Sequence, residues 1–197
     1  MIVIYTSDQG LFLGEHGWFD KPFMYEVSFY MHFLMCYPEG ITAATVCHEM
    51  LYNVEFTPTF LDNAQLSIPN YVQGLSARTV LEEKPPNNWP QNAYYRYWIH
   101  RDPDHNAYSH YAIRDQRYKL ISWYNDGFDL FGTNSGGQDK EWELFDLKRD
   151  PLELFNVADD LAYFEIKAEI GMSLSTKRSC PKDGKNITPE ITGRHKV

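Results

Sequence analysis

Four short runs of aromatic and β-branched residues in the second half of the chain set the tightest limit on its fold. Such residues favour strands, and Asp150-Pro151 then leads into a pattern that predicts a helix over about 157–175. We therefore expect four antiparallel strands packed with a terminal helix. The four runs are residues 93–99 (AYYRYWI), 108–113 (YSHYAI), 117–124 (RYKLISWY) and 142–146 (WELFD).

The first 80 residues or so predict a different architecture. Residues 2–6 (IVIYT) are typical of a buried parallel strand that ends in a functional loop, and residues 33–37 (FLMCY) read as a second buried strand. Residues 53–64 place apolar side chains at helical spacing, with Asn53 as the candidate N-cap. The order of strand and helix predicts an α/β fold. The polar, proline-containing stretch over 76–89 is expected to be a connection.

The composition excludes some classes of protein. The 197 residues contain 18 Lys and Arg against 27 Asp and Glu, a net charge of −9, whereas nucleic-acid-binding proteins usually present a basic face. No apolar run reaches the ~18 residues that a membrane span needs. The three cysteines have neither the spacing of a metal site nor the number of a disulfide framework. We expect no nucleic-acid partner and no membrane span. The sequence gives no indication of the oligomeric state.

The loop after the first apolar run carries candidate ligands for a metal and an anion. Asp8 and Gln9 offer a carboxylate and an amide carbonyl, hard oxygen ligands that suit Ca²⁺ or Mg²⁺. An ordinary turn is the alternative. Lys21 follows 13 residues after Asp8, and beside a divalent cation it would bind an anionic group as a point charge. A solvated surface lysine is the alternative there.

A second cluster of basic residues lies in the strand-rich half. In an extended strand, His110, Ala112 and Arg114 face one side while Tyr111 and Ile113 face the other. A histidine and an arginine on one sheet face would suit a sulfated or carboxylated sugar, and edge-strand charges with solvated heads are the alternative. The cluster consists of His100, Arg101, His105, His110, Arg114, Arg117 and Lys119.

Taken together, these segments resemble the sulfatase family, in particular arylsulfatases and glycosaminoglycan or mucin sulfatases. The resemblance covers the chain to about residue 170. It implies an alkaline-phosphatase-like α/β fold, hydrolysis of a sulfate ester, a calcium ion, a formylglycine nucleophile and a periplasmic, secreted or lysosomal location. Four blocks carry it in order: SDQGLFLGEHGWFDK from Ser7, EFTPTFLDNAQLSIPNYVQG from Glu55, HYAIRDQRYKLISWY from His110 and WELFDLKRDPLELFNV from Trp142.

The resemblance implies roles for five residues. Asp8 and Gln9 match the family's calcium ligands in the Ser-Asp-Gln-Gly motif. Lys21 matches the lysine that grips the substrate sulfate, and Asp20 lies where sugar-directed members contact the saccharide ring. His110 matches the residue of the C-terminal subdomain that reaches over the substrate pocket. The implied ligand is a sulfated saccharide or an aryl sulfate.

The chain also departs from the family. The Cys/Ser-x-Pro-x-Arg motif that yields formylglycine is absent, and so are the paired aspartates of the family's first strand. Cys36 begins a Cys-x-Pro run, but the run lacks the arginine and follows the metal motif, so we reject Cys36 as the nucleophile. Pro22 stands where relatives directed to amino-sugar 6-sulfates often have arginine, and Tyr30 and His32 replace an expected arginine and proline.

These observations predict the C-terminal portion of a sulfatase that is inactive alone, with no nucleophile in this chain. Residues 1–80 are expected to be the end of the catalytic α/β domain and 81–175 a small antiparallel-sheet subdomain packed with a terminal helix. Residues 176–197 are expected to be a polar tail.

Three alternatives stay open. The chain could be a non-catalytic module that binds sulfated glycans through Lys21, His110 and Arg114. It could also be a gene fragment without independent function. A related phosphatase or phosphodiesterase is the third, although the zinc-ligand histidines of those enzymes are not visible in the sequence.

Overall fold

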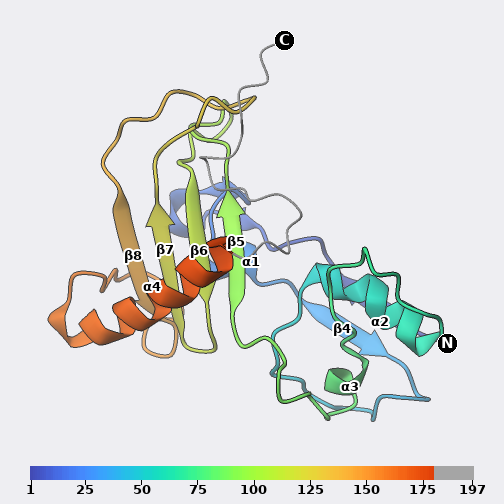
Figure 1. Ribbon diagram of the computed structural model, residues 1–197. Coiled ribbons are helices and arrows are strands. Elements are labelled where there is room, and N and C mark those ends of the chain that lie inside the picture. The colour runs from blue at the N-terminus through green and yellow to red at the C-terminus, as the bar shows by residue number, and fades with distance from the viewer. Residues whose placement is uncertain (180–197) are drawn as a thin grey trace. The chain divides into compact units, whose positions relative to one another are not determined.

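The computed structural model describes residues 1–179, which form two compact units (Figure 1). Unit 1 consists of Met1–Asp8 and Met31–Gln91. Unit 2 consists of Gln9–Tyr30 and the described residues from Asn92 onward. Unit 2 is therefore built from two segments that unit 1 separates along the chain, and the domain boundaries expected from the sequence stay a prediction.

Unit 2 is centred on a four-stranded antiparallel sheet in the order β5-β6-β7-β8. Each strand pairs antiparallel with the next one along the chain. All four predicted strands are confirmed, with ends displaced by a few residues. The strands are β5 (Ala93–Tyr97), β6 (His110–Arg114), β7 (Tyr118–Trp123) and β8 (Glu141–Asp146).

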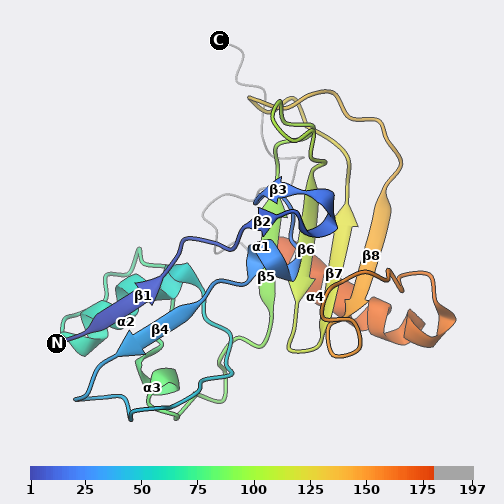
Figure 2. The ribbon, with the colours of Figure 1, turned by 180° about the vertical axis from the view of Figure 1, so that it is seen from behind.

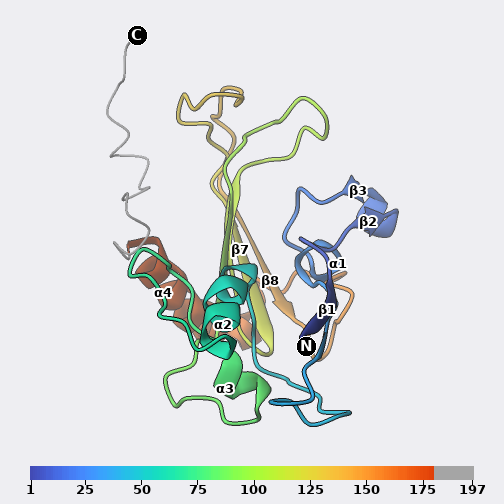
Figure 3. The same cartoon turned by 90° about the vertical axis from the view of Figure 1, so that its right-hand side faces the viewer.

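Helix α4 (Phe164–Ser179) covers one face of this sheet, as the edge-on view in Figure 3 shows. Its Ile170 and Leu174 pack in one core with Leu120 and other apolar side chains of the strands. The terminal helix was predicted to begin near residue 157. It begins later because Asp160, which accepts a hydrogen bond from the Ala162 amide at 2.9 Å, starts a separate short turn, η3 (Leu161–Tyr163). The helix continues past residue 175, and residues 180–197 of the expected tail lie outside the described part.

The segment Gln9–Tyr30 covers the opposite face of the sheet (Figure 2). Met24 packs there with Ala112 and Ile121, which confirms that Ala112 and Tyr111 face opposite sides of β6. Gly10 permits the close approach, because a Cβ at this position would lie 2.2 Å from the carbonyl oxygen of Val27. The segment contains β2 (Phe12–Leu13), η1 (Glu15–Gly17), β3 (Phe19–Asp20) and α1 (Glu26–Phe29).

A buried group of charges ties the two segments of unit 2 together. The Lys119 Nζ lies 2.7 Å from a carboxylate oxygen of Glu26 and 2.7 Å from one of Glu153. The Lys119 and Glu153 side chains are 0% and 1% exposed. Arg114 donates to both oxygens of Glu26, at 3.2 and 3.1 Å. Two cations thus balance two carboxylates in this group. Residues 9–30 are therefore held against the sheet by ion pairs as well as by apolar contacts.

Unit 1 is a two-stranded ribbon with three short helical elements. Strands β1 (Val3–Thr6) and β4 (Phe33–Cys36) pair antiparallel, with Val3 opposite Cys36 and Tyr5 opposite Leu34. Its core gathers Phe33 and Met35 of β4 with Ala77, Val80, Leu81 and Trp89. The helical elements are η2 (Asn53–Glu55), α2 (Phe56–Asn63) and α3 (Arg78–Leu81).

Two local predictions for unit 1 are wrong. The run 2–6 was expected to be a buried parallel strand, but among the described residues β1 pairs only with β4, which runs antiparallel, and Val3 and Tyr5 are exposed. The helix over 53–64 is confirmed, but Asn53 is not its cap. Glu55 caps this turn instead, because its side chain accepts a hydrogen bond from the Tyr52 amide at 2.9 Å. No helix within residues 1–179 is long and apolar enough to cross a membrane.

Candidate functional site

Hydrogen bonds from the side chains of Gln9 and Ser28 fix the backbone of the loop that carries Lys21. All three residues belong to unit 2. The Gln9 side-chain amide donates to the Lys21 carbonyl oxygen at 3.3 Å and to the Ser28 hydroxyl at 3.0 Å. The Ser28 hydroxyl donates to the same carbonyl at 3.2 Å, and Ser28 is fully buried. The half-buried Lys21 therefore projects from a backbone that two side chains hold in place.

Asp20, the residue before Lys21, presents a partly exposed carboxylate. It ends β3, where it pairs with Phe12, and its φ of 72° lies in the left-handed region. A non-glycine residue pays a conformational cost there, which the surrounding contacts must offset. One carboxylate oxygen lies 3.3 Å from the His105 Nε2, and the side chain is 44% exposed. One side of this carboxylate is thus held by the protein while another part reaches solvent.

His105 is held in turn by Asp102, at the base of the connection between β5 and β6. The His105 Nδ1 lies 2.9 Å from an Asp102 carboxylate oxygen. Asp102 also accepts hydrogen bonds from the backbone amides of Asp104, His105 and Ala107, at 3.1, 2.8 and 2.9 Å. Burial raises the pKa of this carboxyl, but the hydrogen bonds outweigh burial and hold the pKa below its usual value. Asp20, His105 and Asp102 form a continuous chain of polar contacts.

His110, which the resemblance placed over a substrate pocket, is completely buried in unit 2. Its ring centroid lies 4.4 Å from that of Trp123 and 5.6 Å from that of Tyr97. Its Nδ1 lies 2.8 Å from the Tyr108 carbonyl oxygen, and its Nε2 has no hydrogen-bond partner within the described residues. Burial lowers the pKa of His110 to about 4. We assign it a packing role as a neutral imidazole, and its contact with a substrate stays a prediction.

Most of the other basic residues in the predicted cluster have structural partners. Arg114 and Lys119 belong to the buried charge group, and Arg117 pairs with Asp146 at 2.7 Å. His100 is fully buried and contacts the Ser109 hydroxyl at 3.2 Å. The solvated-charge alternative is therefore wrong for the buried members. His105 is the member of the cluster that reaches the loop of Asp20 and Lys21.

No specific role of His105 or Asp102 was predicted from the sequence. Their signal was present as the Asp-Pro-Asp-His run at 102–105, because an aspartate that begins a turn commonly accepts hydrogen bonds from the amides two and three positions later. The contact between His105 and Asp20 spans 85 positions and has no local signature.

The described residues do not form a complete calcium site. Ca²⁺ takes six to eight oxygen ligands, whereas Asp8 and Gln9 offer one carboxylate and one amide. Gln9 already directs its amide nitrogen to Lys21 and Ser28. Among residues 1–179, no group of three or more His, Cys, Asp or Glu side chains is placed to hold a metal ion. Asp8 and Gln9 alone would leave most of the coordination shell of a calcium ion unfilled.

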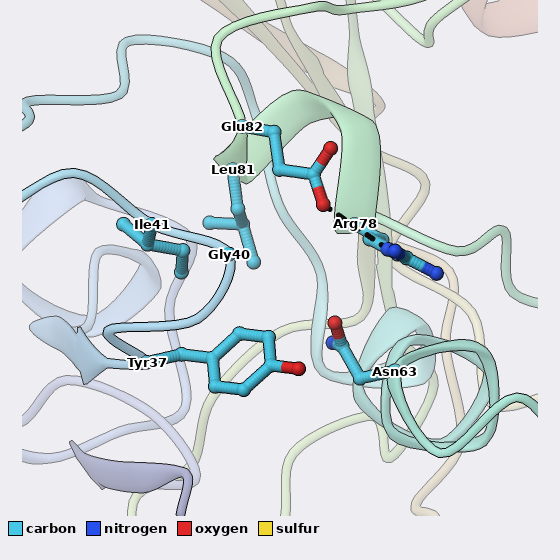
Figure 4. Close-up of a pocket in the computed structure, with 7 residues that line it drawn as sticks. All are labelled: Tyr37, Gly40, Ile41, Asn63, Arg78, Leu81 and Glu82. Carbon is cyan, nitrogen blue, oxygen red and sulfur yellow. Dashed lines mark hydrogen bonds and ion pairs between the residues drawn. The ribbon is translucent and has the colours of Figure 1, made fainter.

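Unit 1 contains a small pocket with one cation, which is already paired (Figure 4). The Nε of Arg78 donates to Glu82 at 3.1 Å, and its guanidinium also lies 3.5 Å from Asp62. Because two carboxylates flank this guanidinium, the pocket is unsuited to a sulfate. The lining consists of Tyr37, Gly40, Ile41, Asn63, Arg78, Leu81 and Glu82.

Comparison with protein families and curated proteins gives consistent matches. The family model of the C-terminal part of N-sulphoglucosamine sulphohydrolase matches residues 14–179. The chain is 41% identical over 184 residues to an N-acetylglucosamine-6-O-sulfatase of Bacteroides thetaiotaomicron, covering 92% of this chain and 31% of that protein. It is 33% identical over 184 residues to arylsulfatase K of Homo sapiens, covering 92% and 32%. The chain thus spans about a third of the length of these relatives.

Solved structures agree with the predicted fold class. A protein in complex with its substrate D-glucosamine-2-N,6-O-disulfate matches with a TM-score of 0.82 and 39% identity, over 98% of this chain and 36% of that one. A 2-O glycosaminoglycan sulfatase matches with a TM-score of 0.71 and 22% identity, over 92% and 36%, which supports the fold alone. The expected alkaline-phosphatase-like α/β class, with a small antiparallel sheet and a helix, is confirmed.

Proposed function

Because this chain belongs to the sulfatases, through the C-terminal family of N-sulphoglucosamine sulphohydrolase, we propose that it supplies part of a site that hydrolyses a sulfate ester on a sulfated carbohydrate. One observation carries the proposal: Asp20 and Lys21 are adjacent on a loop whose backbone Gln9 and Ser28 fix. A lysine binds sulfate as a point charge, and a carboxylate accepts hydrogen bonds from sugar hydroxyl or amino groups.

The proposed substrate class is a sulfated amino sugar. Two comparisons support this choice, the match to the N-acetylglucosamine-6-O-sulfatase and the match to the solved structure that contains D-glucosamine-2-N,6-O-disulfate. In this assignment Lys21 binds the sulfate and Asp20 contacts the sugar ring. An aryl sulfate without a further ring hydroxyl or amino group, such as phenyl sulfate, offers Asp20 no donor, so we expect it to bind more weakly.

We propose that Asp8 and Gln9 contribute two oxygen ligands to a calcium site that further residues complete. When bound, calcium would neutralise part of the sulfate charge. The chain contains no Cys/Ser-x-Pro-x-Arg motif for a formylglycine nucleophile. We therefore expect the purified 197-residue chain to show no turnover of an aryl sulfate, with or without calcium, and calcium-dependent turnover would contradict this assignment.

A binding experiment tests the assignment of Lys21. The chain is titrated with D-glucosamine 6-sulfate and, in parallel, with unsulfated D-glucosamine. We expect measurable binding of the sulfated sugar only, with a dissociation constant that rises with salt because the contact is ionic. Lys21→Ala should weaken binding at least tenfold, and Lys148→Ala, at an exposed lysine of the same unit, should leave it unchanged. Equal binding by Lys21→Ala would overturn the assignment.

A chimera distinguishes a sulfatase portion from a non-catalytic glycan-binding module. The matching third of the 41%-identical sulfatase is replaced by this chain, which covers that region over 92% of its own length. A sulfatase portion should support turnover of D-glucosamine 6-sulfate that Lys21→Ala abolishes. A folded chimera that binds the sugar without turnover would favour the binding module instead.

A further inference from the structure

We infer that His105 and Asp102 are positioning residues that hold the carboxylate of Asp20 in one orientation for contact with a sugar hydroxyl or amino group. This inference rests on the proposed function, since it concerns the same site and specifies how its sugar-binding carboxylate is set. It begins from the unbroken contacts from Asp20 to His105 at 3.3 Å and from His105 to Asp102 at 2.9 Å.

The inner end of this chain of contacts is rigid. Asp102 is 6% exposed and accepts three backbone hydrogen bonds, so its carboxylate has little freedom to turn. The connection around it is closed by two backbone hydrogen bonds, from Arg101 to Ala107 at 2.7 Å and from Asn106 to Asp102 at 2.9 Å. A ring fixed at Nδ1 by such an anchor presents Nε2 in a defined direction.

The chemistry of the three groups favours orientation of Asp20. A carboxylate accepts hydrogen bonds, and the His105 ring lies between two carboxylates, with Nδ1 2.9 Å from an oxygen of Asp102 and Nε2 3.3 Å from an oxygen of Asp20. A carboxylate has about four lone-pair sites, and the contact with His105 occupies one side of Asp20 only. Acceptor capacity therefore remains for a ligand.

Two features of Asp20 favour a ligand-directed role over a purely structural contact between loops. The carboxylate is 44% exposed, and an exposed ion pair contributes little to stability. Lys21 follows directly, so the oriented acceptor lies next to the residue proposed to bind sulfate.

A ligand-free measurement tests the contact itself. Imidazole ¹⁵N spectra are recorded for the full 197-residue chain and for its Asp20→Asn and Asp102→Asn variants, with His105→Gln to assign the signals. We expect the His105 Nε2 signal to move in Asp20→Asn and the Nδ1 signal to move in Asp102→Asn. An Nε2 signal that is unchanged in Asp20→Asn overturns the inference, whatever the chain binds.

Binding measurements then separate positioning from general damage. The probes are D-glucosamine 6-sulfate and inorganic sulfate, and far-ultraviolet circular dichroism checks that each variant is folded. His105→Ala should weaken binding of the sugar sulfate about tenfold, because Asp20 loses the contact that orients it. Binding of inorganic sulfate should change by less than twofold. His105→Gln, which keeps a donor, should recover part of the loss. His105→Ala combined with Asp20→Asn should bind no worse than Asp20→Asn alone.

The outcomes distinguish the two proposals. Additive losses in the double variant, or an equal loss for inorganic sulfate in His105→Ala, overturn the positioning role while leaving the role of Lys21 intact. Unchanged binding of both probes in Lys21→Ala overturns the proposed function, and the ¹⁵N spectra then decide separately whether His105 holds Asp20.

Discussion

Replacing Lys119 by methionine is expected to destabilise unit 2 by about 3–5 kcal/mol at neutral pH, the usual cost of removing one partner from a buried ion pair. The Nζ lies 2.7 Å from an oxygen of Glu26 and 2.7 Å from an oxygen of Glu153. At an effective dielectric constant of 20, each contact has a Coulomb energy of about 6 kcal/mol. Desolvation of the buried ammonium offsets most of this attraction in the wild type. Methionine has a similar length, so the loss is mainly electrostatic.

The variant should lose less stability in acid than at neutral pH. Burial already raises the pKa of Glu153 against the opposing effect of Lys119, and removing the cation raises it further. A carboxyl whose folded pKa lies above its unfolded pKa binds more protons in the native state, so stability rises as the pH falls through that window. The deficit of Lys119→Met should therefore be smaller at pH 5 than at pH 7.5.

Urea unfolding followed by tryptophan fluorescence measures this effect, since four of the five tryptophans lie in unit 2. Lys148→Met, at an exposed lysine, is the matched control and should change the free energy of unfolding by less than about 0.5 kcal/mol. Glu153→Gln in the Lys119→Met background should recover part of the loss, because it removes one uncompensated charge. A loss below about 1 kcal/mol in Lys119→Met, or no recovery in the double variant, would refute the reasoning.

Three further predictions concern single side chains. Burial raises the pKa of Glu55 to about 7 from 4.5, so the stability of the wild type falls as the pH rises between these values. In urea titrations, Glu55→Gln should therefore stabilise unit 1 by up to about 3 kcal/mol at pH 8 and by little at pH 5. Gly10→Ala should lower the stability of unit 2 by about 1–3 kcal/mol in thermal unfolding, because the added methyl group meets a backbone oxygen. An unchanged melting temperature would contradict this prediction. The hydrogen bond from Arg117 holds the pKa of the buried Asp146 below its usual value. The stability that this pair contributes at neutral pH is therefore lost as the pH falls through the lowered pKa. Asp146→Asn should flatten this acid limb of the pH–stability curve.

Side-chain type alone sufficed to predict the sheet of unit 2. Its strands are short, follow one another along the chain and alternate between two covered faces, so each carries its own local signal. The helix over 53–64 was predictable for the same reason. The direction of β1 was not, because an apolar run such as IVIYT has the same pattern whichever way its neighbour runs.

The candidate site was predictable only in part. Asp20 and Lys21 lie within one motif, and a motif is a local property of the sequence. His105 and His110 were both visible as histidines of one cluster, but their surroundings differ completely. His110 is enclosed by aromatic rings supplied by β5, β7 and the segment around Phe23. His105 is half-buried and contacts Asp20, which lies 85 residues earlier in the chain, so only the tertiary structure brings the two side chains together.

The two-segment construction of unit 2 has a consequence for how the protein is made. Residues 9–30 leave the ribosome long before the sheet that they cover, since Glu26 and its partner Arg114 are 88 positions apart. At about 5–20 residues per second, synthesis takes roughly 4–18 s to reach that partner. During this interval the apolar side chains of Phe12, Phe23 and Met24 have no sheet to pack on, and closing so long a loop also slows folding. Nascent chains stalled between these segments should therefore be the species that chaperones bind most strongly.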